Sequence, residues 1–295
     1  MPVLEVRRAR PLLGTYVEVT LAGADRGELV SAAGAALDAV AEIGRRLSFH
    51  DPQSLLARLM REAHRSPVEV DGATFRLLRR TLSWARRTGG GFDPVRAAPP
   101  LVAAGLLPAP RDTPAADPRA TWADVVLDVA GRVRFRRPLW LDLGGIAKGF
   151  AVDRAVATLR RAGVRSGCVN AGGDLRVFGE RRIRVGLRDG ASGDRLVAFV
   201  ELAAAALASS SACFSRRTLA ADRADPAPAA TTTVSHLVDT LGGGFFVAPR
   251  GASAVAPSCL AAEVLAKMAL FAPRRAAELA RSVGGRLLPL SEAGT

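Results

Sequence analysis

The stretch LDLGGIAKGFAVDRA, residues 141–155, decides how the middle of this chain folds. Alternating leucines predict a strand that ends at the glycine pair Gly144 and Gly145, and the apolar spacing that follows predicts a helix from about Ala147. A strand end, a glycine turn and a helix start place backbone N–H groups and the positive helix end around an open space. Lys148 adds a charge in the first helical turn, so the stretch predicts an anion-binding turn. A plain strand-to-helix turn is the alternative.

Lysine is rare in this sequence. All but two of the 41 basic residues are arginine, and the two lysines are Lys148 and Lys267. The net charge of +13 is compatible with a nucleic-acid or other anionic partner. However, arginines occur in nearly every segment, and aromatic residues, which would stack on bases, make up only 5% of the chain. We therefore expect no nucleic-acid partner, whereas a basic pocket for a phosphate-bearing small molecule fits the charge.

Length and apolar content indicate the class of protein. A chain of 295 residues with 49% hydrophobic residues is long enough for one large domain or two closely joined lobes. It has no run of about 18 uninterrupted apolar residues. It begins MPVLEVRRARPLLGT, without the apolar segment of a secretion signal, so we expect a cytoplasmic protein with no membrane contact. Cys168, Cys213 and Cys259 are far apart and predict no disulfide framework.

Hydrophobic periodicity predicts helices and strands in mixed order. Asp51-Pro52 predicts the start of a short helix that ends at Ala63. The segment 139–143 reads as the first strand of a βαβ-like unit, and long irregular connections are expected over 97–120 and 215–233. Mixed elements without strict alternation indicate an α+β fold with mixed α/β layers. Further elements are expected over 15–21 (strand) and over 28–46, 72–88, 147–162, 258–271 and 274–283 (helices).

Three other segments carry polar groups beside glycines or at a strand end. They are GFDP with Asp93, VNAGGD with Asn170, Gly172, Gly173 and Asp174, and HLVD with His236 and Asp239. Each is weak evidence alone, because a glycine pair followed by aspartate is typical of a hairpin turn and a single histidine is often structural. The sequence lacks the dinucleotide, P-loop and serine-hydrolase signatures G-x-G-x-x-G, G-x-x-x-x-G-K-[ST] and G-x-S-x-G in their required contexts.

In order and spacing, these segments together resemble the FAD:protein FMN transferase family, the flavinyltransferases also called ApbE. The similarity covers nearly the whole chain, from Leu13-Gly14-Thr15 through GFDP, LDLGGIAKGFAVD and VNAGGDLRVFG to HLVD. The resemblance implies an α+β fold of two lobes with a flavin-binding cleft, in a single domain spanning 1–295. It implies that FMN is moved from FAD onto a threonine of a partner flavoprotein, with release of AMP.

The resemblance also assigns roles to residues of this chain. His236 is the implied base that takes the threonine proton, and Lys148 is implied near the phosphates, so both are catalytic candidates. The carbonyl of Ala147 is implied to help hold a magnesium ion. The residues implied to bind FAD are Asp93, Gly144, Gly145, Ala147, Lys148, Asn170, Gly172, Gly173, Asp174 and Asp239.

The sequence departs from the family pattern at Met60, at the serines 209–211 and after Asp239, and most seriously near the C-terminus. The family carries Ala-Asp-x-x-x-Thr near the C-terminus, whose Asp and Thr complete the magnesium site, and Glu263 and Lys267 occupy those positions here. Ala147 and Glu263 remain candidate ligands, but a protonated lysine has no lone pair for a metal ion. Because residues i and i+4 share one helix face, we expect Glu263 to hold the Lys267 ammonium near the place of magnesium. A simple surface pair is the alternative.

Two functions therefore stay open. The first is an active flavinyltransferase with FAD as its substrate. The second is a non-catalytic FAD-binding protein of the same fold that serves as a carrier, sensor or partner subunit. His236 favours the first function, whereas Lys267 at a metal-ligand position favours the second.

Overall fold

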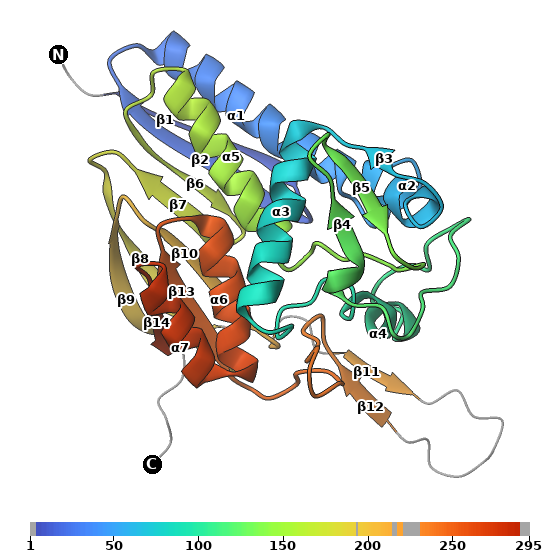
Figure 1. Cartoon of the computed structure of the whole chain (residues 1–295). Helices are drawn as coiled ribbons and strands as arrows, with labels where there is room; N and C mark the ends of the chain where they lie inside the picture. Colours follow the sequence, from blue (N-terminus) through green and yellow to red (C-terminus); the bar gives the residue numbers. More distant parts are fainter. Residues whose placement is uncertain (1–3, 193, 214–216, 221–230, 290–295) are drawn as a thin grey trace.

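The protein is built around a seven-stranded sheet. In the computed structural model, which describes residues 4–192, 194–213, 217–220 and 231–289, the strand order of this sheet is β1-β2-β6-β7-β10-β13-β14 (Figure 1). Every neighbouring pair of strands runs antiparallel. The strands are β1 (Leu4–Leu12), β2 (Thr15–Gly23), β6 (Ser166–Ala171), β7 (Asp174–Phe178), β10 (Ala206–Ser211), β13 (Gly251–Ala256) and β14 (Arg286–Pro289).

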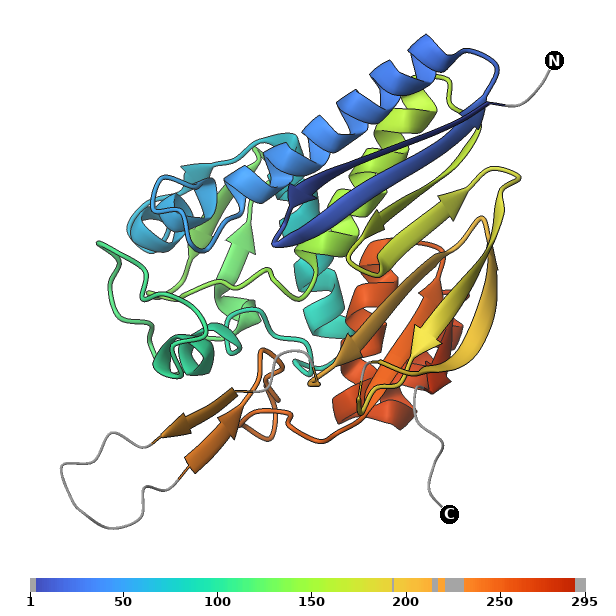
Figure 2. The same cartoon turned by 180° about the vertical axis from the view of Figure 1, so that it is seen from behind.

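Helices cover one face of this sheet. α1 (Arg26–Arg46) and α5 (Ala147–Arg161) lie side by side over β2 and β6 (Figure 1 and Figure 2). α6 (Cys259–Phe271) packs on β10 and β13, and α7 (Pro273–Ser282) lies next to it. Because α5 and α6 also contact each other, two helices that are far apart in the sequence meet over the middle of the sheet.

A two-stranded sheet covers part of the opposite face. It consists of β8 (Arg182–Arg188) and β9 (Leu196–Ala203), which pair antiparallel and pack on the main sheet through a separate apolar cluster. The strands of the main sheet alternate between the two cores, as successive side chains of a strand must. On β10, for example, Ala206 and Ala208 belong to the helix-covered core, whereas Leu207 belongs to the other.

The chain between α1 and α5 forms a smaller layer beside the main sheet (Figure 1). It contains a three-stranded sheet with strand order β3-β5-β4, three α-helices and a short 3-10 helix over Trp122–Asp124. These helices and strands are α2 (Leu55–Glu62), β3 (Val68–Glu69), α3 (Gly72–Arg87), α4 (Ala98–Ala103), β4 (Val125–Leu127) and β5 (Arg132–Phe135).

The start of α2 differs from the sequence prediction. The helix begins at Leu55, not at Asp51-Pro52, because the Ser54 hydroxyl accepts the N–H of Ala57 (3.0 Å) and is the N-cap. The Asp51 carboxylate instead accepts the N–H of Gln53 (2.9 Å) in the turn that precedes the helix.

The segment 139–143, predicted as a strand, is not a strand, although its leucines are buried. Its three leucines are each 2% exposed or less. The N–H of Asp142 donates to the carbonyl of Pro94 (2.9 Å), and the N–H of Leu141 faces Sδ of Met60 (3.4 Å), so neither group joins a sheet ladder. Alternation predicts burial on one side of an extended chain, whereas the hydrogen-bond partner depends on long-range packing. The predicted βαβ-like unit is therefore wrong.

The two connections predicted as irregular contain regular elements. α4 lies within 97–120, and the described residues of 215–233 include two paired strands, β11 (Arg217–Ala220) and β12 (Thr231–Val234). These two strands project from the body of the protein (Figure 2). Residues 214–216 and 221–230 of that stretch lie outside the described part of the chain.

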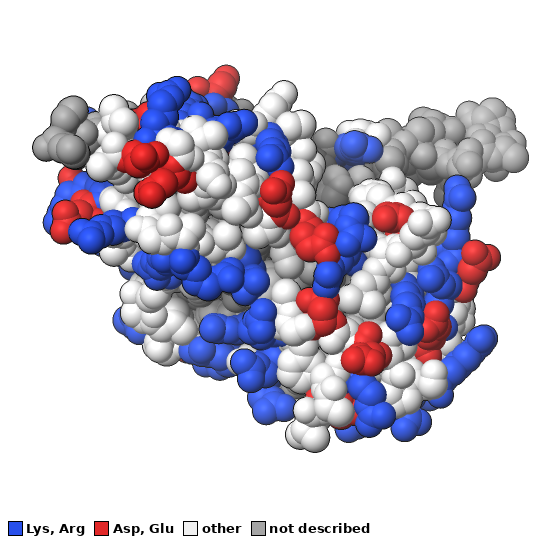
Figure 3. All heavy atoms as spheres, turned by 90° about the horizontal axis from the view of Figure 1, so that it is seen from above, with Lys and Arg blue, Asp and Glu red and all other residues white. Residues whose placement is uncertain are grey.

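Acidic side chains lie among the basic ones on the surface drawn in Figure 3. The basic residues of that face therefore do not form one continuous positive stripe. Elsewhere in the described residues, ion pairs also join arginines to acids, as between Arg45 and Glu42 (2.8 Å) and between Arg132 and Asp128 (2.7 Å). Across the described residues, no helix combines the length and the apolar character that crossing a lipid bilayer requires.

Candidate active site

A cavity of about 450 Å³ opens where segments far apart in the sequence meet. It lies between the turns 91–94 and 144–148, the segment 236–238 and helix α6. Apolar side chains form most of its walls. This size and lining are typical of a small-molecule site. The apolar residues include Phe92, Leu101, Leu107, Val238, Met268 and Phe271, and the charged or titratable ones are Asp93, Asp142, Lys148, His236 and Lys267.

Carboxylates of the protein itself accept backbone N–H groups at the glycine turn and in the first turn of α5. The N–H of Gly144 donates to Oδ1 of Asp142 (2.8 Å), and the N–H of Gly149 donates to Oε2 of Glu263 (2.8 Å). Neither Gly144 nor Gly145 has a φ in the left-handed region. A Cβ at Gly145 would lie 3.0 Å from the ring of Phe92, so this glycine is needed for close packing. Two of the N–H groups near the helix start are thus already bonded within the protein.

Two ammonium groups and two carboxylates meet beside the cavity. Oε1 of Glu263 lies 3.0 Å from Nζ of Lys267 and 3.3 Å from Nζ of Lys148. The Lys148 ammonium also pairs with the carboxylate of Asp174. The side chains of Glu263 and Asp174 are only 2% and 4% exposed, whereas those of Lys148 and Lys267 are 34% and 20% exposed. The lysines line the cavity, and the carboxylates lie behind them.

Burial and charge act in opposite directions in this network. Burial alone would lower the pKa of Lys148, but the carboxylates of Glu263 and Asp174 outweigh it and raise that pKa. Burial would likewise raise the pKa of Glu263, but Lys148 and Lys267 outweigh it and hold the pKa below its ordinary value. For Asp174, burial prevails over the attraction of Lys148 and raises the pKa. Lys148 is therefore held in its charged form, and Glu263 is ionised.

The residues at this point do not fit a magnesium ion. Magnesium requires several oxygen ligands in near-octahedral geometry. Both oxygens of Glu263 are already bonded, and Lys267 presents an ammonium group. Within the described ranges, no three His, Cys, Asp or Glu side chains are grouped so that they could hold a metal ion. Ala147, the other ligand implied by the resemblance, is the first residue of α5 and does not line the cavity.

His236 lies exposed at the rim of the cavity, on a loop that is fixed on both sides. Before it, the hydroxyl of Ser235 donates to the carbonyl of Phe246 (2.6 Å). After it, the hydroxyl of Thr240 donates to the carbonyl of Gly90 (2.6 Å). These bonds hold the loop in place and leave the imidazole open to a group that enters from solvent.

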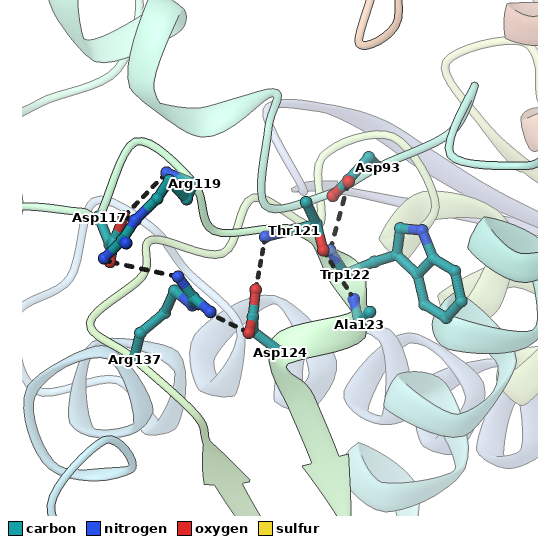
Figure 4. Close-up of polar contacts among 8 residues, drawn as sticks. All are labelled: Asp93, Asp117, Arg119, Thr121, Trp122, Ala123, Asp124 and Arg137. Atoms are coloured by element: carbon teal, nitrogen blue, oxygen red, sulfur yellow. Dashed lines mark hydrogen bonds and ion pairs between the residues drawn. The ribbon is translucent and has the colours of Figure 1, made fainter.

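Asp93 joins the turn 91–94, which lines the cavity, to the segment around Trp122 (Figure 4). Its Oδ1 accepts the N–H groups of Val95 (2.9 Å) and Arg96 (3.2 Å), and its Oδ2 accepts the N–H of Trp122 (3.2 Å). Burial raises the pKa of Asp93, and the bonds from these three N–H groups act against that rise. Because both oxygens accept backbone groups, the carboxylate fixes the turn 91–94 against the segment around Trp122.

A polar network supports that second segment (Figure 4). The N–H of Thr121 donates to Oδ2 of Asp124 (3.0 Å), which completes a capping box around the 3-10 helix. Arg137 pairs with both Asp124 (3.0 Å) and Asp117 (3.4 Å). These contacts fix the position of Trp122, whose backbone N–H donates to Asp93.

The remaining predicted residues line two neighbouring cavities. Asn170, Gly172 and Gly173 line one of about 530 Å³, and Asp239 lines another of about 500 Å³. Gly172 and Gly173 have positive φ values of 64° and 100° and form the two-residue turn between β6 and β7, as the hairpin interpretation predicted. Asn170 accepts the N–H of Gly173 through its side chain (2.8 Å), and Asp239 accepts two N–H groups of its own loop (3.0 Å each).

Asp142 and the serines 209–211 line the cavity but were not among the predicted site residues. Burial raises the pKa of Asp142, and the charges of Lys267 and His236 act to lower it. The sequence did contain a signal for Asp142, because it stands as a polar residue between two buried leucines. The serines line both the first and the second cavity, so these two spaces adjoin along β10.

Comparison with known proteins gives one family. A sequence model described as "ApbE family" matches residues 13–287. Two relatives named "FAD:protein FMN transferase" are similar to this chain. The one from Treponema pallidum (strain Nichols) is 31% identical over 45% of this chain, and the one from Rhodobacter capsulatus is 32% identical over 64% of it. The matched parts span only 40% and 38% of those relatives' own lengths.

Solved structures of the same fold cover nearly the whole chain. The ApbE protein from Thermotoga maritima has a TM-score of 0.81 at 24% identity and covers 99% of this chain and 96% of its own. The flavin transferase ApbE from Vibrio cholerae has a TM-score of 0.74 at 20% identity and covers 98% of this chain and 94% of its own. At these identities the similarity establishes the fold, and it confirms the predicted α+β architecture.

Proposed function

Because this chain belongs to the ApbE family, we propose that it is an FAD:protein FMN transferase, which moves FMN from FAD onto a threonine of a partner flavoprotein and releases AMP. One observation carries the proposal: Lys148, Lys267 and His236, from three distant segments, line one cavity with apolar walls. A ligand with a flat ring and a diphosphate matches this lining. Apolar surface accepts the ring, and ammonium groups accept the phosphate oxygens.

The bound substrate extends beyond the first cavity. FAD carries two ring systems joined through a diphosphate, and the second cavity adjoins the first along serines 209–211. Asn170 and the turn of Gly172 and Gly173 then lie beside one end of the substrate. Asp93 and Asp239 shape the walls and the loop near the reacting centre through backbone hydrogen bonds.

The transfer is a single exchange of phosphorus–oxygen bonds. The threonine hydroxyl attacks the phosphorus on the FMN side, its new O–P bond forms, and the bond from that phosphorus to the AMP oxygen breaks. His236 accepts the hydroxyl proton at the rim of the cavity. The charge that develops on the departing AMP phosphate is stabilised by the ammonium groups of Lys148 and Lys267.

The test is incubation of the protein with FAD and a candidate acceptor flavoprotein, followed by intact mass measurement of the acceptor. We expect a gain of one FMN less one water, and no gain when the acceptor threonine is replaced by alanine. FAD binding without any gain, across acceptors known to be flavinylated elsewhere, would instead identify the non-catalytic FAD-binding alternative. A cytoplasmic location and a single domain over 1–295 remain predictions from the sequence.

A further inference from the structure

The carboxylate of Glu263 joins two ammonium groups that come from different helices. Lys148 lies in the first turn of α5, and Lys267 lies one turn after Glu263 on α6. Their Nζ atoms lie 3.3 and 3.0 Å from the same oxygen, Oε1. The other oxygen accepts the N–H of Gly149 (2.8 Å). A shared carboxylate therefore holds two positive charges side by side.

The backbone supplies less of the positive charge than a helix start usually does. The N–H groups of Gly144 and Gly149 are bonded to Asp142 and Glu263, so they are not available to a ligand. The stem of Lys267 instead runs next to the glycine turn, where a Cβ at Gly145 would lie 3.6 Å from its Cδ. The ammonium of Lys267 is thus brought to the turn where an anion would otherwise meet N–H groups.

The arrangement presents cations to the cavity and keeps anions behind them. Lys148 and Lys267 line the cavity, whereas Glu263 and Asp174 are nearly fully buried. A protonated lysine has three N–H donors and no acceptor, so an ammonium that donates to one carboxylate still has donors for a second anion. Two acids, Asp93 and Asp142, do line the cavity, and burial raises the pKa of both, which favours their neutral forms.

We propose that Lys148 and Lys267, held together by Glu263, do the work of a divalent cation and bind the metal-free diphosphate of FAD. This inference rests on the proposed function. Lys148 and Lys267 each keep an N–H donor beyond their bonds to the carboxylates, so each can bind one phosphate of the metal-free diphosphate. A magnesium complex of FAD has part of its negative charge already neutralised. The free dinucleotide is therefore the form that the site prefers.

The test compares FAD affinity in excess EDTA with FAD affinity in millimolar magnesium, by fluorescence titration of the full chain. The affinity in EDTA is expected to equal or exceed that in magnesium. Lys267→Met should weaken binding by roughly 10- to 100-fold in both buffers, because it removes a charge-assisted hydrogen bond. An affinity at least about tenfold tighter in magnesium than in EDTA would overturn the proposal.

A second variant puts oxygen donors where this site presents an ammonium group. Glu263→Asp combined with Lys267→Thr supplies two oxygen donors without an ammonium, and its FAD affinity should become magnesium-dependent. Arg58→Met is the matched control, because Arg58 and Glu62 form an i,i+4 ion pair (3.0 Å) on the exposed face of α2. It should leave the affinity unchanged in both buffers.

The possible failures are distinguishable. If the lysine variants do not fold, the comparison of buffers on the unchanged protein still decides the question. If the unchanged protein binds FAD only with magnesium, this inference fails and the proposed function survives. If it binds FAD in neither buffer, the proposed function fails, and this inference fails with it.

Discussion

Nζ of Lys148 lies 3.3 Å from Oε1 of Glu263, although 115 positions separate the two residues. The contact depends on a close crossing of α5 and α6 at Gly149, where a Cβ would lie 2.6 Å from the carbonyl oxygen of Cys259. Asp153 fixes the same crossing, because its carboxylate accepts the N–H of Cys259 (2.9 Å) at the start of α6. The charged network beside the cavity is therefore a product of helix packing.

Gly149→Ala should separate these helices. The added methyl group meets backbone atoms that cannot rotate away, so we expect a loss of about 1–3 kcal/mol in the free energy of unfolding and weaker FAD binding. Urea denaturation measures the loss. Gly34→Ala in α1 is the control, since nothing lies within 4 Å of its added Cβ, and it should leave stability unchanged or raise it by up to about 1 kcal/mol. Equal stability of the Gly149→Ala variant and the unchanged protein would contradict this account of the crossing.

His236→Ala should slow transfer without preventing binding. Loss of a positioned base typically reduces the rate about 10²- to 10⁴-fold, whereas the diphosphate contacts of Lys148 and Lys267 are retained. Single-turnover transfer and a separate FAD titration measure the two effects. His50→Ala, an exposed histidine outside this cavity, should change neither. Normal turnover of the His236 variant would show that another group takes the proton.

The site should prefer ligands that carry phosphate. We expect FAD to bind at least about tenfold more tightly than riboflavin, because riboflavin offers the two ammonium groups no anion. Fluorescence titrations with FAD, FMN and riboflavin provide the comparison. Equal affinities for all three would mean that the ring alone is recognised and that the lysines do not contact the ligand.

The free energy of unfolding should depend on pH in part through the ionisation of Asp71, the N-cap of α3. Burial would raise its pKa, but hydrogen bonds from Thr74 and Arg46 outweigh burial and lower the pKa to about 2. A lowered acid pKa stabilises the fold above the unfolded value, 3.8, and this contribution is lost as the pH falls towards 2.

Asp71→Asn should therefore cost about 1 kcal/mol at neutral pH, after allowance for solvent screening, with the difference narrowing below about pH 4. Urea denaturation of both proteins from pH 2 to 7 measures it. A difference that stays constant over this range would show that the carboxylate charge plays no part.

Several of the long helices could be predicted from the sequence. The helices over 72–88, 147–162 and 258–271 were predicted nearly as they occur, because their apolar spacing and end signals are local. The same local rule placed Glu263 and Lys267 on one helix face, and the structure confirms their contact at 3.0 Å.

The parts that were wrong or missed depend on long-range packing. The alternation in 139–143 predicted a strand, but the N–H groups of Leu141 and Asp142 bond to residues of the smaller layer instead. Nothing in the sequence indicates that the Glu263 carboxylate accepts the N–H of Gly149 in the first turn of α5. Asp142 was overlooked because its place in the cavity depends on the fold around it.

The most direct test of FMN transfer measures both products in one reaction. The protein is incubated with FAD and an acceptor flavoprotein in EDTA, and AMP and the flavin-modified threonine are quantified together. We predict equal amounts of AMP and of acceptor that carries FMN through a phosphoester on one threonine. With the His236→Ala variant, the initial rate at which both products form should be lower by about 10²- to 10⁴-fold. Tight FAD binding with no AMP and no modified acceptor, in either EDTA or magnesium, would contradict the account.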